Sequence, residues 1–349
     1  MALSKEDRIK TVWGGGGHVV ILGAGASIAS NIRNHEPNGK ILPSMNNFID
    51  IVGLADIVDK LPDHLKAPNF EQLYSNLYNE NPTSVEIIEI EERVYYYFQN
   101  MELPNEATIY DHLVLALRPR DIIATFNWDP FLFQAWQRNK KFTSDLPYLV
   151  FLHGNVAIGY SKEHKRMGLS GYTSKDTGHY YEPTQLLYPV TKKNYISDEF
   201  ISGQWDHIKY GLHREETKLV TVFGYGAPAT DVEAMQLLNE AYGTPDDREM
   251  EQFEIIDIRP KEEVLKQWDG FIHSHHYDFS NNYFDSLLAH NPRRTSEAYF
   301  QHYMPKSIDE SFSESNPVPS NLKTIQELWD WHKPLLDAED EWKKQSENN

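Results

Sequence analysis

The sequence predicts an α/β fold, a Rossmann-like parallel sheet with a large helical insertion and a C-terminal helical extension. Apolar runs at residues 18–22, 121–126 and 147–152 are typical of buried strands, and small or polar residues follow each of them. The carboxyl ends of parallel strands meet at one edge of a sheet, where open α/β folds bind ligands. The three runs therefore predict both the sheet and the edge that would hold a site.

The second half of the chain alternates between strand-like and helix-like patterns. We expect strands at residues 218–223 and 253–258, followed by helices at 231–242 and 261–271 respectively. Such alternation implies parallel pairing, with helices on both faces of the sheet.

Between the first two strands, residues from about 45 to 118 have a largely helical pattern. Phe70, Leu73, Tyr74 and Leu77 recur at helical spacing, which indicates a face that packs on a core. The stretch is too long for an ordinary loop, so we expect a helical insertion.

Domain boundaries follow from changes in composition. Residues 1–303 would form one catalytic domain, in which the irregular segment 156–198 forms a lid or a small subdomain. Residues 304–320 contain three prolines and five serines and are expected to be a linker. Residues 321–349 would be a C-terminal helix with a polar tail.

Composition excludes several classes of function. The 349 residues contain no cysteine, so disulfides, thiolate zinc sites and cysteine nucleophiles are impossible. With 33 basic and 52 acidic residues the net charge is −19, which disfavours a broad nucleic-acid-binding face. No apolar run approaches the length of a membrane span, and the polar first ten residues do not resemble a signal peptide. We therefore expect a cytoplasmic protein.

A glycine-rich turn follows the first strand. Gly23 and Gly25 can adopt positive φ and let a ligand approach the backbone of Ala24, and Ser27 adds a hydroxyl donor. The start of the next helix would suit a pyrophosphate. A tight turn with no ligand is the alternative. The usual dinucleotide fingerprint has a third glycine where Ile28 stands, so this is not an ordinary dehydrogenase.

Polar residues also follow the second and third strands. Asn127 ends a buried strand and must find hydrogen-bond partners. Asp129 either takes part in chemistry or simply caps the helix expected from Pro130. His153 has a side chain suited to general base catalysis, although a histidine at a strand end is more often structural.

In this order, Gly-Ala-Gly-Ala-Ser, Thr-Phe-Asn-Trp-Asp and Leu-His-Gly resemble the sirtuin (SIR2-like) superfamily. The resemblance is strongest to the SIR2-like NAD-consuming effectors of bacterial anti-phage defence, and it covers roughly residues 18–260. It implies a SIR2-type sheet with NAD⁺ bound as substrate. The cofactor-binding residues that it implies are Gly23, Ala24, Gly25, Ser27, Thr125, Gly224, Tyr225, Asp231 and Asp257.

The resemblance implies an NAD⁺ glycohydrolase that releases nicotinamide and ADP-ribose and defends the cell by depleting NAD⁺. Asn127 would bind a ribose hydroxyl or orient water, His153 would act as base, and Asp129 would orient or stabilise this group. Two departures argue against peptide deacylation. The zinc-binding cysteines are absent, and residues 42–45 replace the Pro-Asp-Phe-Arg segment of the family.

Two alternatives remain, a sirtuin-like protein ADP-ribosyl or acyl transferase and a non-catalytic sensor of NAD⁺ or ADP-ribose. Because constant NAD⁺ hydrolysis would harm the cell, we expect a homo-oligomer or a complex with an operon-encoded sensor. His273, His275 and His276 are close enough in sequence to bind a metal, but no matching ligand set is visible, so no metal is expected.

Overall fold

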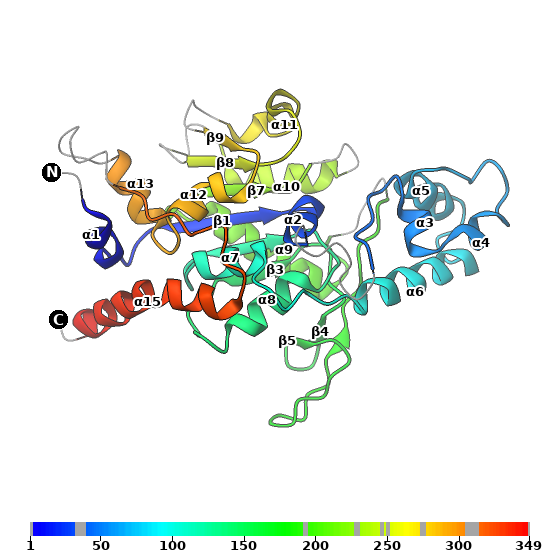
Figure 1. The fold of residues 1–349 in the computed structure, drawn as a ribbon. Coiled ribbons are helices and arrows are strands. Elements are labelled where there is room, and N and C mark those ends of the chain that lie inside the picture. Colours follow the sequence, from blue (N-terminus) through cyan, green and yellow to red (C-terminus); the bar gives the residue numbers. More distant parts are fainter. Residues whose placement is uncertain are drawn as a thin grey trace.

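The computed structural model describes residues 3–31, 40–190, 195–226, 231–244, 248, 252–272, 277–303 and 314–347. The predicted α/β fold is confirmed. A six-stranded parallel sheet carries helices on both faces, and a small three-stranded antiparallel sheet lies beside it (Figure 1).

Successive strands are added first on one side of the first strand of the parallel sheet and then on its other side. The strand order is β3 (Tyr148–Phe151), β2 (Ile122–Thr125), β1 (Gly17–Leu22), β7 (Thr217–Phe223), β8 (Gln252–Ile256) and β9 (Tyr277–Ser280). From β1 the chain builds outward to β2 and β3, then crosses to β7 on the other side of β1. This crossover is a topological switch point, where ligands bind at the carboxyl ends of strands in open α/β sheets.

Alternate residues of β1 point to opposite faces of the sheet and contact different helices. His18 lies 3.2 Å from Thr295 of α13 (Thr295–Tyr303), whereas Val19 lies under Gly211 of α9 (Glu199–His213). The helices that complete these layers are α7 (Ile109–Ala116), α8 (Phe131–Asn139), α10 (Val232–Tyr242) and α12 (Leu287–His290). The helices α9, α12 and α13 were not predicted from the sequence.

The helical insertion forms as predicted and lies beyond the carboxyl edge of the sheet (Figure 1). It contains α3 (Phe48–Val52), α4 (Ala55–Val58), α5 (Phe70–Glu80) and α6 (Val85–Gln99), and it leads into α7. The stripe formed by Phe70, Leu73, Tyr74 and Leu77 is buried, which confirms the core-facing pattern of α5. The short helix α2 (Ala24–Ser30) connects β1 to this insertion region.

Residues 156–198, expected to be irregular, contain the antiparallel sheet. Its strands are β4 (Ile158–Ser161), β5 (Arg166–Leu169) and β6 (Glu182–Pro183), in the order β5-β4-β6. In Figure 1 the loops of this sheet project from the body of the molecule. Strands of two to four residues are too short to give a periodic pattern, which explains why the sequence did not reveal them.

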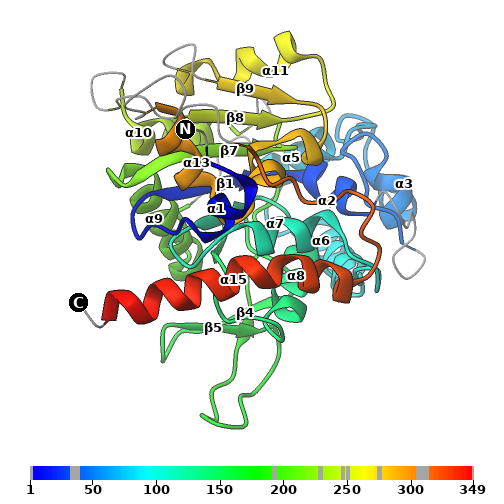
Figure 2. The same cartoon turned by 60° about the vertical axis from the view of Figure 1, so that its left-hand side comes forward.

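The C-terminal helix α15 (Ile325–Glu347) packs along the body of the protein, next to α1 (Lys5–Lys10) (Figure 2). Leu328 and Leu335 are buried, and the Glu339 carboxylate accepts hydrogen bonds from Arg293 and Arg294. Most of the expected linker, residues 304–313, lies outside the described residues.

The remaining described elements are α11 (Lys261–Gln267) and 3-10 turns at Asp269–Phe271 and Tyr283–Asp285. In the described part of the chain, no helix is both long and apolar enough to cross a membrane.

Candidate functional site

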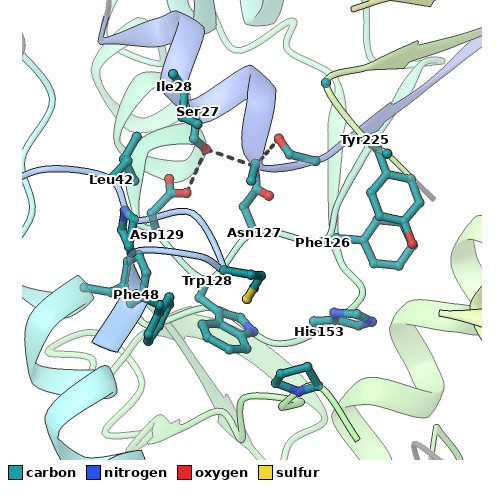
Figure 3. Close-up of a pocket in the computed structure, with 18 of the residues that line it drawn as sticks. Ser27, Ile28, Leu42, Phe48, Phe126, Asn127, Trp128, Asp129, His153 and Tyr225 are labelled. Atoms are coloured by element: carbon teal, nitrogen blue, oxygen red, sulfur yellow. Dashed lines mark hydrogen bonds between the residues drawn. The ribbon is translucent and has the colours of Figure 1, made fainter. Parts of the chain in front are cut away.

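A cavity of about 300 Å³ lies at the carboxyl edge of the parallel sheet, beside the crossover between β1 and β7 (Figure 3). Its wall is formed by the segments that follow β1, β2, β3 and β7, and the helical insertion adds apolar side chains such as Phe48 and Phe98. Of the predicted site residues, nine line it: Gly23, Ala24, Ser27, Asn127, Asp129, His153, Gly224, Tyr225 and Asp231. Gly25, Thr125 and Asp257 lie outside this wall.

Ser27 connects the polar side chains on one side of the cavity. Its Oγ donates to Asp129 Oδ2 at 2.7 Å and accepts from Asn127 Nδ2 at 2.9 Å (Figure 3). The Tyr110 hydroxyl, from α7, lies 2.7 Å from the same oxygen. Because the single Ser27 proton goes to Asp129, Tyr110 donates its own proton to Ser27. The result is a buried, ordered network that joins α2, α7 and the segment after β2.

The orientation of the Asn127 amide follows from its partners. Its Nδ2 donates to the carbonyl oxygen of Gly23 at 2.7 Å, and a carbonyl oxygen can only accept. The nitrogen must therefore face Gly23 and Ser27, which leaves Oδ1 as the side-chain atom available to a ligand. Asn155 holds the loop in place, since its Nδ2 donates to the backbone oxygens of Asn127 and Asp129.

Asp129 has the structural contact that the sequence analysis considered for it, and it also lines the cavity. Its Oδ1 accepts from the backbone N–H of Phe131 at 3.2 Å, so it caps the start of α8. Its Oδ2 accepts from Ser27, and the residue also lines the cavity. Burial raises the pKa of Asp129 to about 6, because desolvation penalises the charged form.

His153 lies across the cavity from Ser27, on the segment after β3 (Figure 3). Its Nε2 is 3.2 Å from the Tyr195 hydroxyl, and its ring meets Phe126 edge-on at 4.8 Å between centroids. Gly154 has φ +75°, and a Cβ there would lie 2.0 Å from the Gln185 carbonyl oxygen. Only glycine allows this turn, which places the imidazole at the cavity.

An aromatic surface continues from His153 to β7. Phe126 stacks on Tyr225 with 4.1 Å between centroids and an interplanar angle of 8°. The Tyr225 hydroxyl donates to Asp231 Oδ2 at 2.9 Å. The two rings lie one over the other and form an apolar part of the cavity wall, and the Asp231 carboxylate lies beside Tyr225.

The glycine turn differs from the expectation. Gly23 has φ −116°, and Gly25 lies inside α2, so neither has positive φ. Close packing requires these glycines instead, because a Cβ on Gly23 would lie 2.5 Å from Tyr225 Cα. Gly224, with φ +60°, is the residue in the left-handed region, and a Cβ there would lie 2.4 Å from the Ala26 nitrogen.

The backbone amides of the turn are largely used within the protein. Gly23 N donates to Phe223 O, Gly25 N to Gly224 O, and Ala26 N to Gly23 O. A pyrophosphate would therefore meet fewer free donors here than the sequence pattern suggested. Ala24, which lines the cavity, is the remaining position of the turn for such a contact.

Thr125 and Asp257, two of the predicted residues outside the cavity wall, contact other groups of the protein. Thr125 Oγ1 accepts from the backbone N–H of Asn127, and Asp257 forms an ion pair with Arg259. The three histidines of residues 273–276 lie outside the described residues. In the part of the chain that is described, no group of three or more His, Asp or Glu side chains could hold a metal ion.

Sequence reasoning missed Tyr110, Tyr195 and Glu71 as residues of the site region. Tyr110 is one apolar residue among many in α7, and only its contact with Ser27 distinguishes it. Tyr195 lies outside every regular pattern. Asn155 was visible in the motif after β3, and its position beside His153 was the available signal.

No family model matches this sequence, and no curated protein matches it. Solved structures of Sir2 homologues are similar. One, in complex with NAD, has 16% identity and a TM-score of 0.36 over 80% of this chain and 89% of that chain. A triple mutant with 2'-O-acetyl-ADP-ribose has 14% identity and a TM-score of 0.38 over 79% and 90% of the two chains. A mutant with ADP-ribose has 13% identity and a TM-score of 0.34 over 73% and 84%.

Proposed function

We propose that this protein is an NAD⁺ glycohydrolase, which cleaves NAD⁺ to nicotinamide and ADP-ribose with water as the acceptor. One observation carries the proposal. An amide, a carboxylate and an imidazole, from Asn127, Asp129 and His153, converge from two neighbouring strand ends on one cavity at the crossover of the sheet. A cavity with apolar walls and a few convergent polar groups is the usual form of a small-molecule site.

The charge of the cavity fits the reacting end of NAD⁺. The carboxylates of Glu71, Asp129 and Asp231 are part of the wall. A negative wall favours a cation, and the nicotinamide ring of NAD⁺ carries the positive charge. The ring would lie against the apolar part of the wall that Phe126 and Tyr225 form, and the pyrophosphate would extend toward Ala24.

The reaction breaks the bond between nicotinamide and C1' of the ribose. Nicotinamide leaves as a neutral molecule with the bonding electrons, and the positive charge passes to the ribose in an oxocarbenium-like state. Asn127 Oδ1 would accept a hydrogen bond from a ribose hydroxyl or from the attacking water. His153 would take the proton that the water loses. The ionised Asp129 would stabilise the developing positive charge.

A product analysis tests this function. The purified protein is incubated with NAD⁺, and nicotinamide and ADP-ribose are quantified over time, with and without EDTA. Equal amounts of both products, unaffected by EDTA, are expected for a metal-independent hydrolase. Nicotinamide with the ADP-ribose retained on protein would indicate a transferase. Binding without cleavage, also when the products of the neighbouring genes are added, would indicate a sensor.

We further infer that the activity serves anti-phage defence by NAD⁺ depletion, and that a partner protein or self-assembly controls it. Constant NAD⁺ hydrolysis would harm the cell, which supports such control. Cells that express the protein with its neighbouring genes should lose NAD⁺ after infection. Cells that carry Asn127→Ala should keep their NAD⁺ and lose protection.

A further inference from the structure

The strand end at β8 presents an arginine toward the candidate site. Arg259 follows β8 by three residues, and its side chain folds back toward the segment after β7. A Cβ placed on Gly226, which lines the cavity, would lie 2.9 Å from Arg259 Nη1. The guanidinium therefore packs against Gly226, next to the cavity, although Arg259 itself is not part of the wall.

The same guanidinium neutralises the acidic residue of this strand end. Asp257 Oδ1 accepts from the backbone N–H and Nε of Arg259, and Oδ2 accepts from Nη2 at 2.7 Å. The Asp257 side chain is buried, whereas the Arg259 side chain is about one-third exposed. Among the described residues, Nη1 forms no hydrogen bond. The pair thus keeps the Asp257 carboxylate buried and leaves Arg259 Nη1 next to Gly226, a residue of the cavity wall.

This arrangement bears on which nucleotide the site accepts. In doubly wound dinucleotide sites, an acidic residue at a strand end binds the 2'-hydroxyl of the adenosine ribose, and a nearby arginine accommodates a 2'-phosphate. A free carboxylate repels that phosphate. Here both oxygens of Asp257 are already occupied by Arg259, so the carboxylate is neutralised and a donor is available.

We propose that Arg259 forms a 2'-phosphate subsite, so that the protein accepts NADP⁺ and its product as well as NAD⁺. This proposal rests on the glycohydrolase function proposed above, because it assumes that the adenosine end of the dinucleotide reaches β8. A guanidinium–phosphate contact is charge-assisted and directional, and its loss typically costs about 1.5–3 kcal/mol, or roughly 10- to 100-fold in affinity.

Calorimetry with two non-cleaved ligands, ADP-ribose and ADP-ribose 2'-phosphate, tests the subsite. The wild-type protein should bind both within about tenfold of each other. Arg259→Ala should weaken binding of the phosphorylated ligand by about 10- to 100-fold and that of ADP-ribose by less than about threefold. Lys261→Ala, which removes a positive charge two residues away, is the matched control and should change neither affinity.

The outcomes separate the two proposals. If ADP-ribose binds but the phosphorylated ligand is rejected, or if Arg259→Ala weakens both ligands equally, the subsite is wrong and the glycohydrolase proposal stands. If neither ligand binds the wild-type protein, the subsite proposal is overturned, and the product analysis alone decides the glycohydrolase proposal. If the predicted selectivity is found without any turnover of NAD⁺, the subsite stands and the hydrolase function fails.

Discussion

The side-chain amide of Asn127 donates a hydrogen bond to the carbonyl oxygen of Gly23, with 2.7 Å between nitrogen and oxygen. The two residues are 104 positions apart in the sequence. This bond joins the segment after β2 to the turn after β1, across the edge where the cavity lies. It also fixes the amide, so that Oδ1 rather than Nδ2 is available to a ligand.

Tyr110 should act on the site by positioning Ser27 and Asn127. Removing its hydroxyl in Tyr110→Phe takes away one of the two donors to Ser27 Oγ and leaves Asn127 Nδ2 as the other, and the loss of such a hydrogen bond typically costs about 1 kcal/mol of stability. We expect a lower urea midpoint and a reduced kcat for nicotinamide release, with a smaller change in KM.

Tyr283→Phe is the matched control for that change. Tyr283 is equally buried, but its hydroxyl has no hydrogen-bond partner among the described residues. Its removal should therefore leave stability unchanged or slightly higher. Equal losses of stability in the two variants would show that the Tyr110 contact with Ser27 contributes nothing specific.

Asp129→Asn should stabilise the protein in a pH-dependent way. Burial raises the pKa of Asp129 to about 6, above its usual value near 3.8. The favourable contribution of protonated Asp129 is fully present below about pH 4 and is lost as the pH rises through about 6. Asparagine avoids the buried charge, so the variant should gain up to about 3 kcal/mol over wild type at pH 8 and nothing at pH 4.

Urea unfolding of both proteins at pH 4, 6 and 8 measures this difference. Nicotinamide release by the variant should fall at the same time, because the carboxylate that stabilises positive charge is gone. A stability difference that stays constant over this pH range would contradict the assigned ionisation of Asp129.

Glu339→Gln should destabilise the fold strongly. Burial alone would raise the pKa of Glu339, but the charges of Arg293, Arg294 and Arg118 lower it to about 2. The variant leaves buried arginines without their counter-charge, and breaking a buried pair of this kind costs about 3–5 kcal/mol. Deleting residues 321–349 removes the same carboxylate and should leave no stable protein.

Asp337→Asn is the control on the same helix. Its ion pair with Lys333 is exposed, and such pairs contribute at most about 1 kcal/mol. The urea midpoint of Glu339→Gln should therefore lie clearly below that of Asp337→Asn. A stable, identically assembled truncation would show that α15 is not part of the folded body.

The strands and the helical insertion could be predicted because their residues follow simple periods. Residues 19–22 before Gly23 are all apolar because both faces of β1 are covered. The stripe from Phe70 to Leu77 has helical spacing because one face of α5 is buried. These patterns are local, so they are visible without knowledge of the fold.

The elements that were missed depend on information that the local pattern conceals. Ile201, Trp205, Ile208 and Leu212 have helical spacing in α9, but glycines inside the helix weaken its apparent propensity. One of these, Gly211, lets α9 approach the sheet, since a Cβ there would lie 2.5 Å from an Ile122 side-chain atom. The need for glycine at position 211 comes from packing against a distant strand, so it cannot be deduced from the sequence of the helix alone.

The candidate site was also predictable only where its features depend on the local sequence. The strand ends that hold Asn127 and His153 were predictable, since residues that end neighbouring parallel strands lie at one edge. The expected positive φ at Gly23 was wrong. A glycine is required at this position by its close contact with Tyr225 and not by a left-handed turn. The role of Tyr110 required the packing of α7 against α2.

Nicotinamide release by Asn127→Ala and His153→Ala, compared with wild type, tests the central claim most directly. The release is measured with the purified chains and in cells that express them, and calorimetry with ADP-ribose and circular dichroism confirm binding and folding. His207→Ala, which removes an exposed histidine on α9, is the control. We predict that both site variants fold but lose at least about 100-fold in rate, whereas the control matches wild type. Near wild-type release by either folded site variant would contradict its catalytic role.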